Sequence, residues 1–213
     1  MKIVVFGAGG TLGRRISDEL VRRGHAVRPV VRSRPGSAEA RRGSKTLVAD
    51  VTNARSVASA VKGADAVVSA VGPAPGEEVG VVLDAARGLL AGLRSAHVVR
   101  LVVVGGAGSL EVSPGVQLED TPGFPVAWKP VAEAHRAALE LYRAEPDLEW
   151  TVVAPAAFIA PGERSGHYRA GGDQLLVDAK GESRITAEDY AVAIADEVET
   201  PRHVRRRFCV AAA

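Results

Sequence analysis

The sequence predicts a single α/β domain, residues 1–213, with a Rossmann-type doubly wound parallel sheet. Short apolar runs that suit buried parallel strands recur along the chain, and a helix-like stretch follows most of them. The segment 2–13, KIVVFGAGGTLG, adds a glycine-rich turn after the first run. A strand, a glycine-rich turn and a helix in this order are typical of nucleotide-binding domains.

The first strand and its turn predict a dinucleotide site. Glycines follow the apolar run at Gly7, Gly9, Gly10 and Gly13, and their spacing fits either GxGxxxG or GxxGxxG. Small residues let the backbone approach a pyrophosphate, whose charge meets the free N–H groups at the helix start. Gly13 lets the helix lie close to the strand. The alternative is a tight turn with a purely structural role.

The end of the second strand, Ala26–Val31, predicts the cofactor. An NAD site usually has an acidic residue here, which accepts hydrogen bonds from the adenosine ribose. This chain has Arg32 instead, with Ser33 and Arg34 beside it. A guanidinium can hold the 2′-phosphate of NADP, so we expect NADP(H) to be preferred over NAD(H). The alternative is that these arginines only solvate a loop.

The third predicted strand, Lys45–Val48, is followed by Asp50 and Val51. These residues fall at the carboxyl edge of the sheet, where ligands of open α/β sheets bind. Asp50 can face the adenine amino group while Val51 packs on the ring. Equally, Asp50 can cap the helix that begins near Ala54.

The middle of the chain continues the alternation. We expect a fourth strand at 64–71, a helix at 78–96 and a fifth strand at 101–104, which runs into GGAGSLE and places Ser109 just beyond its end. The segment 111–129 is rich in proline and glycine and is predicted to be a long functional loop. Pro130 is suited to open a helix that ends near Arg143.

The last third of the chain holds the sixth strand, 150–154, and then an irregular segment, 155–186. Because this segment leaves the carboxyl edge of the sheet, we predict that it covers a substrate pocket; the alternative is a twisted hairpin that decorates the fold. Thr186 is expected to cap a helix that ends near Glu199, and RFCVAA reads as a final strand.

Composition excludes several classes of protein. Cys209 is the only cysteine, so an intrachain disulfide and a cysteine metal cluster are impossible, and the scattered histidines predict no metal site. The net charge is +2, and the arginines at 202–207 are better explained by a solvated surface than by nucleic-acid binding. We predict a cytoplasmic monomer or homodimer without membrane or nucleic-acid partners.

Four stretches together resemble one family. They are GAGGTLG, the VVRS that ends the second strand, VVVGGAGSL after the fifth strand, and the C-terminal block from WTVVAPAAF to PRHVRRRF. These are similar to the small atypical short-chain dehydrogenase/reductase proteins known as NADH-flavin reductases. That group belongs with the NmrA-like and biliverdin-reductase-B-like NAD(P)-binding proteins, and the resemblance covers nearly the whole chain.

The resemblance implies a cofactor site along the carboxyl ends of the strands. The residues that would hold the adenine half and the pyrophosphate are Arg32 on the 2′-phosphate, Asp50 and Val51 on the adenine, and Gly7, Gly10, Thr11, Leu12 and Gly13 on the pyrophosphate. Those of the nicotinamide half would be Ala70, Val71 and Gly72 at the ribose, Gly105 and Gly106 beside the ring, and Pro155 and Phe158 pressing on it. Ser109 would bond to the carboxamide or the substrate, or else only cap a turn.

One departure from the family of short-chain dehydrogenases bears on the reaction. Their Tyr-x-x-x-Lys pair supplies a proton to a carbonyl, but the residue four before Lys129 is Pro125, and Pro146 lies four after Tyr142. Carbonyl reduction therefore lacks its usual proton donor. Hydride transfer to a flavin demands less, because positioning supplies most of the effect and water can supply the proton.

The predicted function is hydride transfer from NADPH to a free flavin or a quinone-like acceptor. Phe158, Trp128, His167 and Tyr168 are candidates to contact such a ring. One alternative is a non-catalytic NADP(H) sensor of the NmrA type. Another is a reductase of a specific conjugated metabolite, with Ser109, Lys129 or His167 as the proton source.

Overall fold

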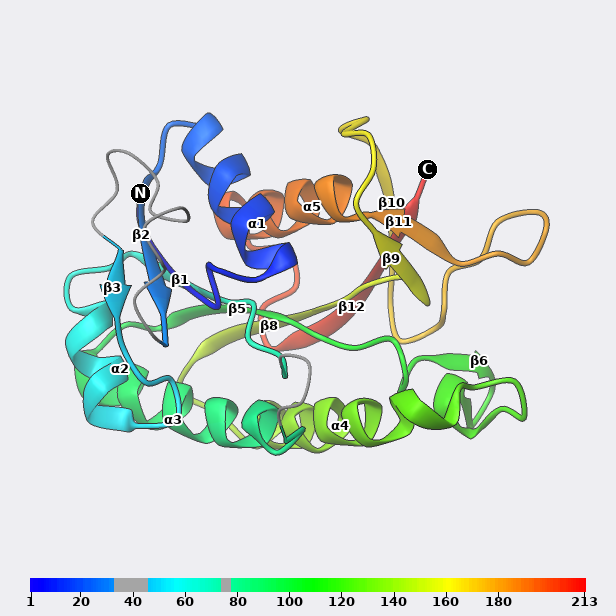
Figure 1. Cartoon of the computed structure of the whole chain (residues 1–213), viewed down its shortest axis with the longest axis horizontal. Helices are drawn as coiled ribbons and strands as arrows, with labels where there is room; N and C mark the ends of the chain where they lie inside the picture. The colour runs from blue at the N-terminus through cyan, green and yellow to red at the C-terminus, as the bar shows by residue number, and fades with distance from the viewer. Residues whose placement is uncertain (33–45, 74–77) are drawn as a thin grey trace.

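The protein is built on one long, mostly parallel sheet (Figure 1). A computed structural model describes residues 1–32, 46–73 and 78–213. The strands follow the order β3-β2-β1-β4-β5-β8-β12, all parallel, and β10 closes the edge antiparallel to β12. Their bounds are β1 Lys2–Phe6, β2 Ala26–Val31, β3 Leu47–Val48, β4 Ala66–Ser69, β5 Arg100–Val104, β8 Glu149–Ala154, β10 Tyr168–Gly171 and β12 Arg206–Ala212.

Helices cover both faces of the sheet, as Figure 1 shows. On one face lie α1 (Thr11–Arg22) and α5 (Ala187–Glu199), and on the other lie α2 (Ala54–Val61), α3 (Val81–Ala96) and α4 (Lys129–Arg143). Alternate strand residues feed the two cores, since successive side chains of a strand point to opposite faces. The predicted doubly wound α/β fold is confirmed, and its order reverses between β1 and β4.

The segment 111–129 is more regular than the sequence predicts. It contains a short antiparallel pair, β6 (Glu111–Ser113) and β7 (Val116–Gln117), followed by two 3₁₀ turns, Leu118–Asp120 and Val126–Trp128. Gly115 makes the hairpin turn possible because it adopts a positive φ of 75°. Proline and glycine here mark tight turns between short elements instead of an open loop.

The segment 155–186 is not a hairpin. Its first strand, β9 (Phe158–Ala160), pairs in parallel with β11 (Arg184–Thr186), while β10 joins the edge of the main sheet. The connection at 161–167 lies against α1 and α5: the Gly166 amide donates to Asp189, and Arg164 pairs with Glu19. As expected, Thr186 caps α5 through its hydroxyl, which accepts a hydrogen bond from the Asp189 amide.

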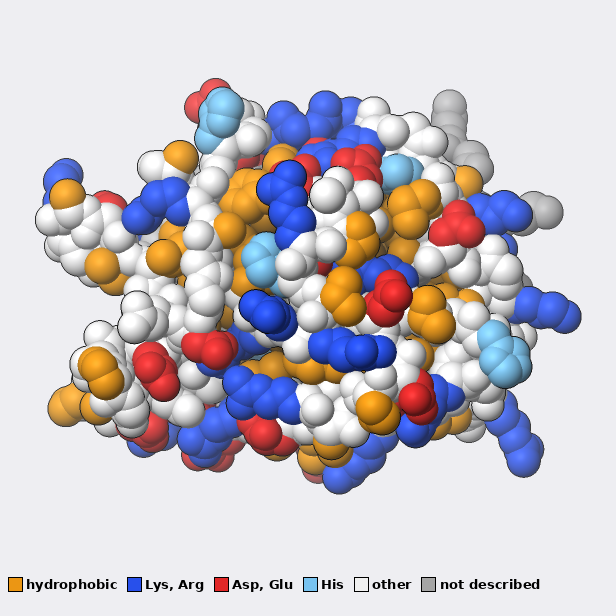
Figure 2. Space-filling model, turned by 180° about the vertical axis from the view of Figure 1, so that it is seen from behind, with side chains coloured by type: hydrophobic (Ala, Val, Ile, Leu, Met, Phe, Trp, Pro, Cys, Tyr) orange, Lys and Arg blue, Asp and Glu red, His pale blue; other side chains and the backbone are white. Residues whose placement is uncertain are grey.

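Charges of both signs are interspersed on the outer surface. Seen from behind the view of Figure 1, lysine and arginine side chains alternate with acidic and apolar ones (Figure 2). Within the described ranges, no helix has the length and apolar character needed to span a bilayer.

A buried carboxylate joins α1 to the segment that follows β9. The Glu19 side chain is only 4% exposed and accepts hydrogen bonds from Arg22, Arg23 and Arg164. Burial by itself would raise the pKa of Glu19, but the three arginine hydrogen bonds outweigh it and lower the pKa to about 2. Glu19 therefore stabilises the fold in its charged form.

We expect Glu19→Gln to lower the free energy of unfolding by about 2 kcal/mol at pH 7, because it removes charge-assisted hydrogen bonds in a buried place. The native pKa is lower than that of the unfolded chain, so the stabilisation is present above pH 4.5 and is lost as the pH falls toward 2. Urea unfolding of both proteins across this pH range measures the difference. The exposed pair partner Glu140 provides the control: Glu140→Gln should change stability by less than about 0.5 kcal/mol.

Candidate nucleotide-binding site

The glycine-rich turn packs by backbone contact where the strand order reverses. Gly7 has a φ of 73°, and a Cβ on it would collide with the carbonyl oxygen of Ala70, just past β4. A Cβ on Gly13 would collide with the carbonyl of Gly7. The amide of Ala70 donates to the carbonyl of Phe6, which joins the two strand ends. The turn is thus held against both strands that border the reversal.

Gly10 has a different role from the other two glycines. It is the N-cap of α1 and is exposed, and a Cβ on it would meet only the Gly7 carbonyl, at 3.4 Å. No side chain caps the helix, and its first turn holds no acidic residue. Gly7, Gly10 and Gly13 therefore fill the three roles of a GxxGxxG turn, and the helix start, with Thr11 at its tip, faces outward.

This geometry fits a pyrophosphate. The amides of the first helical turn have no carbonyl partner within the helix, and the positive end of the helix dipole lies beside them. Gly9 and Gly10 leave the approach to them open, whereas a larger residue at Gly10 would fill it. Leu12 is half-buried and packs toward the core on the α1 side. The residues that the sequence assigns to the pyrophosphate thus lie together at one helix end.

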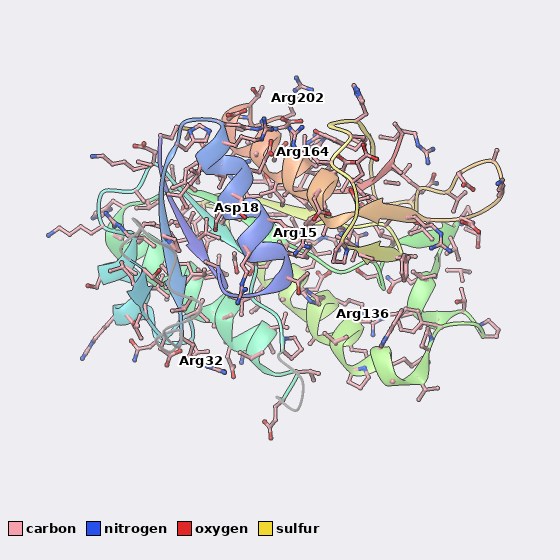
Figure 3. All side chains as sticks on the ribbon, turned by 45° about the horizontal axis from the view of Figure 1, so that its top comes forward. Arg15, Asp18, Arg32, Arg136, Arg164 and Arg202 are labelled. Atoms are coloured by element: carbon pink, nitrogen blue, oxygen red, sulfur yellow. The ribbon has the colours of Figure 1, made fainter. Side chains whose placement is uncertain are left out.

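The residues predicted to contact the adenosine half follow β2 and β3. Arg32 directly follows β2 and is exposed, and Figure 3 labels it near the lower margin of the view. Ser33 and Arg34 lie outside the described residues. The amide of Ala8 donates to the carbonyl of Val30, so the turn after β1 and the end of β2 are neighbours.

The alternative role of Asp50 as the cap of α2 is wrong. Asn53 caps that helix, accepting hydrogen bonds from the amides of Arg55 and Ser56. Asp50 instead accepts hydrogen bonds from the amide and hydroxyl of Thr52 and remains exposed. Its contact with adenine stays a prediction, as does that of the half-buried Val51.

The opposite side of the turn leads to the ends of β4 and β5. Ala70 and Val71 are half-buried and Gly72 is exposed. Gly105 continues the β5 ladder, with its amide donating to the carbonyl of Val153. Gly106 faces α4 at close range, because a Cβ on it would lie 3.1–3.3 Å from atoms of the His135 side chain.

A pocket lies between these strand ends and the helices α3 and α4. It has about 330 Å³ of empty space, part of it open to solvent. Most of its lining is apolar, and the polar side chains are those of Ser69, His135 and Tyr142. The remaining lining residues are Val71, Val82, Ala85, Val103, Val104, Gly105, Ala138, Leu139 and Val152.

His135 is the imidazole at this pocket, and burial sets its protonation state. Burial lowers the pKa of His135 to about 4, so the imidazole is neutral at pH 7. Burial raises the pKa of the Tyr142 phenol well above its usual range, so this group stays neutral too. Within the described part of the chain, no residue hydrogen-bonds to the His135 ring or to the hydroxyls of Ser69 and Tyr142.

The sequence reasoning did not single out His135. The residue lies on the inward face of α4, with Ala132 and Leu139 one turn before and after it. A polar residue on the apolar face of a helix that follows the fifth strand was the available signal.

The three predicted catalytic residues lie outside this pocket. Lys129 is the first residue of α4 and is exposed, and His167 is exposed in the connection that packs on α1 and α5. The Ser109 hydroxyl is buried and accepts a hydrogen bond of 2.7 Å from Arg207. Arg207 also pairs with Asp173, so Ser109 belongs to an ion-pair network at the end of β12.

The residues that the sequence assigns to contact with the nicotinamide or the acceptor ring do not line the pocket. Pro155 is buried directly after β8, while the Phe158 side chain is 48% exposed, with the Arg184 guanidinium 4.9 Å from its ring centroid. Trp128 is 52% exposed just before α4. The hydroxyl of Tyr168 is engaged with Asp196 and does not reach the pocket.

A second buried acid, Glu119, contacts α4. Glu119 is 2% exposed, lies beside Gly108 and Ala132, and has Arg136 Nη1 2.9 Å away. Burial raises the pKa of Glu119, and the charge of Arg136 opposes this increase. Arg136 projects from α4 in Figure 3. Glu119 therefore joins the 111–129 segment to the helix that carries His135.

Residues 7–201 match the model of a protein family described as NAD(P)H-binding. The chain belongs to this NAD(P)H-binding family. The uncharacterized protein YwnB of Bacillus subtilis is 41% identical over 213 residues, 99% of this chain and 98% of YwnB.

Solved structures of related chains have the same fold. A proposed NADH-flavin reductase from Streptococcus pneumoniae is 33% identical with a TM-score of 0.88, and all of both chains is covered. A proposed epimerase from Bacteroides thetaiotaomicron is 37% identical with a TM-score of 0.90, covering 99% of this chain and 96% of that one. A protein from Burkholderia pseudomallei that is called exported is 47% identical with a TM-score of 0.88, covering 99% of each chain. These matches support the family recognised from the sequence, while the cytoplasmic location stays a prediction.

We expect Gly10→Val to abolish dinucleotide binding while the protein stays folded. The valine side chain enters the open space at the helix start, and its cost as an N-cap is only about 1 kcal/mol. Gly13→Ala should mainly affect the fold. Its methyl group meets the Gly7 backbone, so the free energy of unfolding should fall by about 2 kcal/mol or more. Thermal unfolding and titration with NADPH separate the two effects. Binding retained by Gly10→Val would show that the pyrophosphate lies elsewhere.

Proposed function

We propose that this NAD(P)H-binding protein is an NADPH-dependent reductase that passes a hydride to a free flavin or a quinone-like acceptor. The observation that carries the proposal is the face of α4 that lines the pocket. It presents the neutral imidazole of His135, and no tyrosine–lysine pair that could act as a charged proton relay.

In this proposal, different parts of the chain bind the pyrophosphate and the 2′-phosphate of NADPH. The first turn of α1 holds the pyrophosphate, and Arg32 holds the 2′-phosphate on the β2 side. When bound, NADPH supplies a hydride from its nicotinamide C4, and reduction of a flavin is completed by one proton from solvent. The mostly apolar lining of the pocket reduces the access of water to that end of the site, while Gly105 packs against Val152 and Gly106 against His135.

The acceptor's proposed place is supported by exposed aromatic side chains. Phe158 and Trp128 each expose about half of their surface, 48% for Phe158 and 52% for Trp128, so both rings are open to contact with another molecule. A planar acceptor gains from contact with such rings, and a flavin needs no protein acid because its reduced ring takes its proton from water. The carbonyl substrate of an epimerase or dehydrogenase needs an acid. The tyrosine that α4 presents to the pocket, Tyr142, is buried with a raised pKa, and the residue four after it is Pro146 instead of a lysine.

The decisive experiment is steady-state oxidation of NADPH, with NADH in parallel, in the presence and absence of FMN, FAD and riboflavin. The proposal expects flavin-dependent turnover that favours NADPH. Tight NADPH binding without turnover with flavins or quinones would contradict it and favour the NADP(H) sensor.

Arg32→Ala tests the choice of dinucleotide. Removal of a guanidinium that holds a phosphate should weaken NADPH binding about 10- to 100-fold, the equivalent of 1.5–3 kcal/mol. NADH lacks the 2′-phosphate, so its binding should change less than about threefold. Equal losses for the two dinucleotides would overturn the assignment of Arg32. Titration calorimetry of each variant with NADPH and with NADH measures both affinities.

A further inference from the structure

The strand order determines on which side of the turn each half of a dinucleotide must lie. The pyrophosphate site follows β1, at the centre of the order β2-β1-β4-β5. Arg32 and Asp50 lie on the β2 and β3 side, which is therefore the adenosine side. The other half must extend over β4 and β5, and β5 is about 10 Å from β1 because neighbouring strands lie roughly 4.8 Å apart.

His135 lies at the end of this path. Its side chain approaches Gly106, directly beyond the end of β5, and it lines the pocket with Gly105 and Ser69. The packing of α4 fixes this position, because Ala132, Ala138 and Leu139 on either side of it are buried. The imidazole therefore lies on the α3 and α4 face of the sheet, at the carboxyl end of β5, where the nicotinamide half is expected.

The ring nitrogens of His135 are available to hydrogen-bond to a ligand. Among the described residues, none hydrogen-bonds to either ring nitrogen, although the group is half-buried beside apolar walls. A half-buried polar group without a partner costs free energy that a bound ligand can recover. A neutral imidazole has one donor and one acceptor, which suits a hydroxyl or an amide and not a phosphate.

We propose that His135 hydrogen-bonds to the nicotinamide riboside end of the bound dinucleotide, at a ribose hydroxyl or the carboxamide, and so positions this half over β5. The inference rests on the proposed function only in taking NADPH as the ligand. It assigns to α4 a neutral positioning group in place of the Lys129 considered from the sequence, which is exposed at the helix start.

The test compares two ligands that share one half. The first, 2′,5′-ADP, carries the adenosine and the 2′-phosphate without the nicotinamide riboside, whereas NADPH carries both halves. His135→Leu should weaken NADPH binding about 10-fold, the loss of one hydrogen bond from a partly buried group, and should leave 2′,5′-ADP within twofold of the wild type. His135→Gln keeps a donor and an acceptor and should restore most of the NADPH affinity.

Arg32→Ala is the matched control, since it should weaken both ligands to a similar extent. If His135→Leu weakens 2′,5′-ADP as much as NADPH, His135 acts through the fold and the inference is wrong. Equal NADPH affinity in the wild type, the leucine variant and the glutamine variant also overturns it. If the wild type binds neither ligand, the proposed function itself fails, which distinguishes the two failures. Titration calorimetry together with thermal unfolding of each variant gives all of these results.

Discussion

The close approach of backbone to backbone at Gly7, Ala70 and Gly13 is the constraint on which the rest of the site depends. Because no side chain intervenes, α1 begins directly against the ends of β1 and β4. Its first amides then point outward at the place where the strand order reverses. A side chain at either of these glycines would move the helix and with it the proposed pyrophosphate site, so the fold and the proposed site depend on the same contact.

The helices on the two faces of the sheet are held by different kinds of contact. On the face of α1 and α5, a cluster of charges centred on Glu19 ties Arg164 and the segment after β9 to the helices. On the other face, α3 and α4 pack through apolar residues and leave a pocket at the sheet's carboxyl edge. Burial in this pocket keeps the side chains of His135 and Tyr142 neutral, although Arg136 on the same helix pairs with the buried Glu119.

Relatives with different proposed activities share the backbone of this chain. Proteins proposed to be a flavin reductase and an epimerase have nearly the same backbone as this chain. A fold shared by such different names shows how the dinucleotide half of the site is built, while the substrate half depends on a few side chains. In this chain the side chains that α4 presents to the pocket are His135, Ala138, Leu139 and Tyr142.

The sequence by itself determined the parallel sheet, the glycine turn and the N-terminal cap of α5, because each follows from local pattern. Apolar runs mark strands buried on both faces, three glycines mark a turn too tight for side chains, and Thr186 caps its own helix. Only the tertiary structure decided which side chains meet. It brought His135 to Gly106 across elements far apart in the chain and turned Ser109 to Arg207, while Asn53 took the cap role considered for Asp50. These outcomes depend on how α4 and β12 pack on the sheet and on competition between neighbouring side chains, which no local pattern encodes.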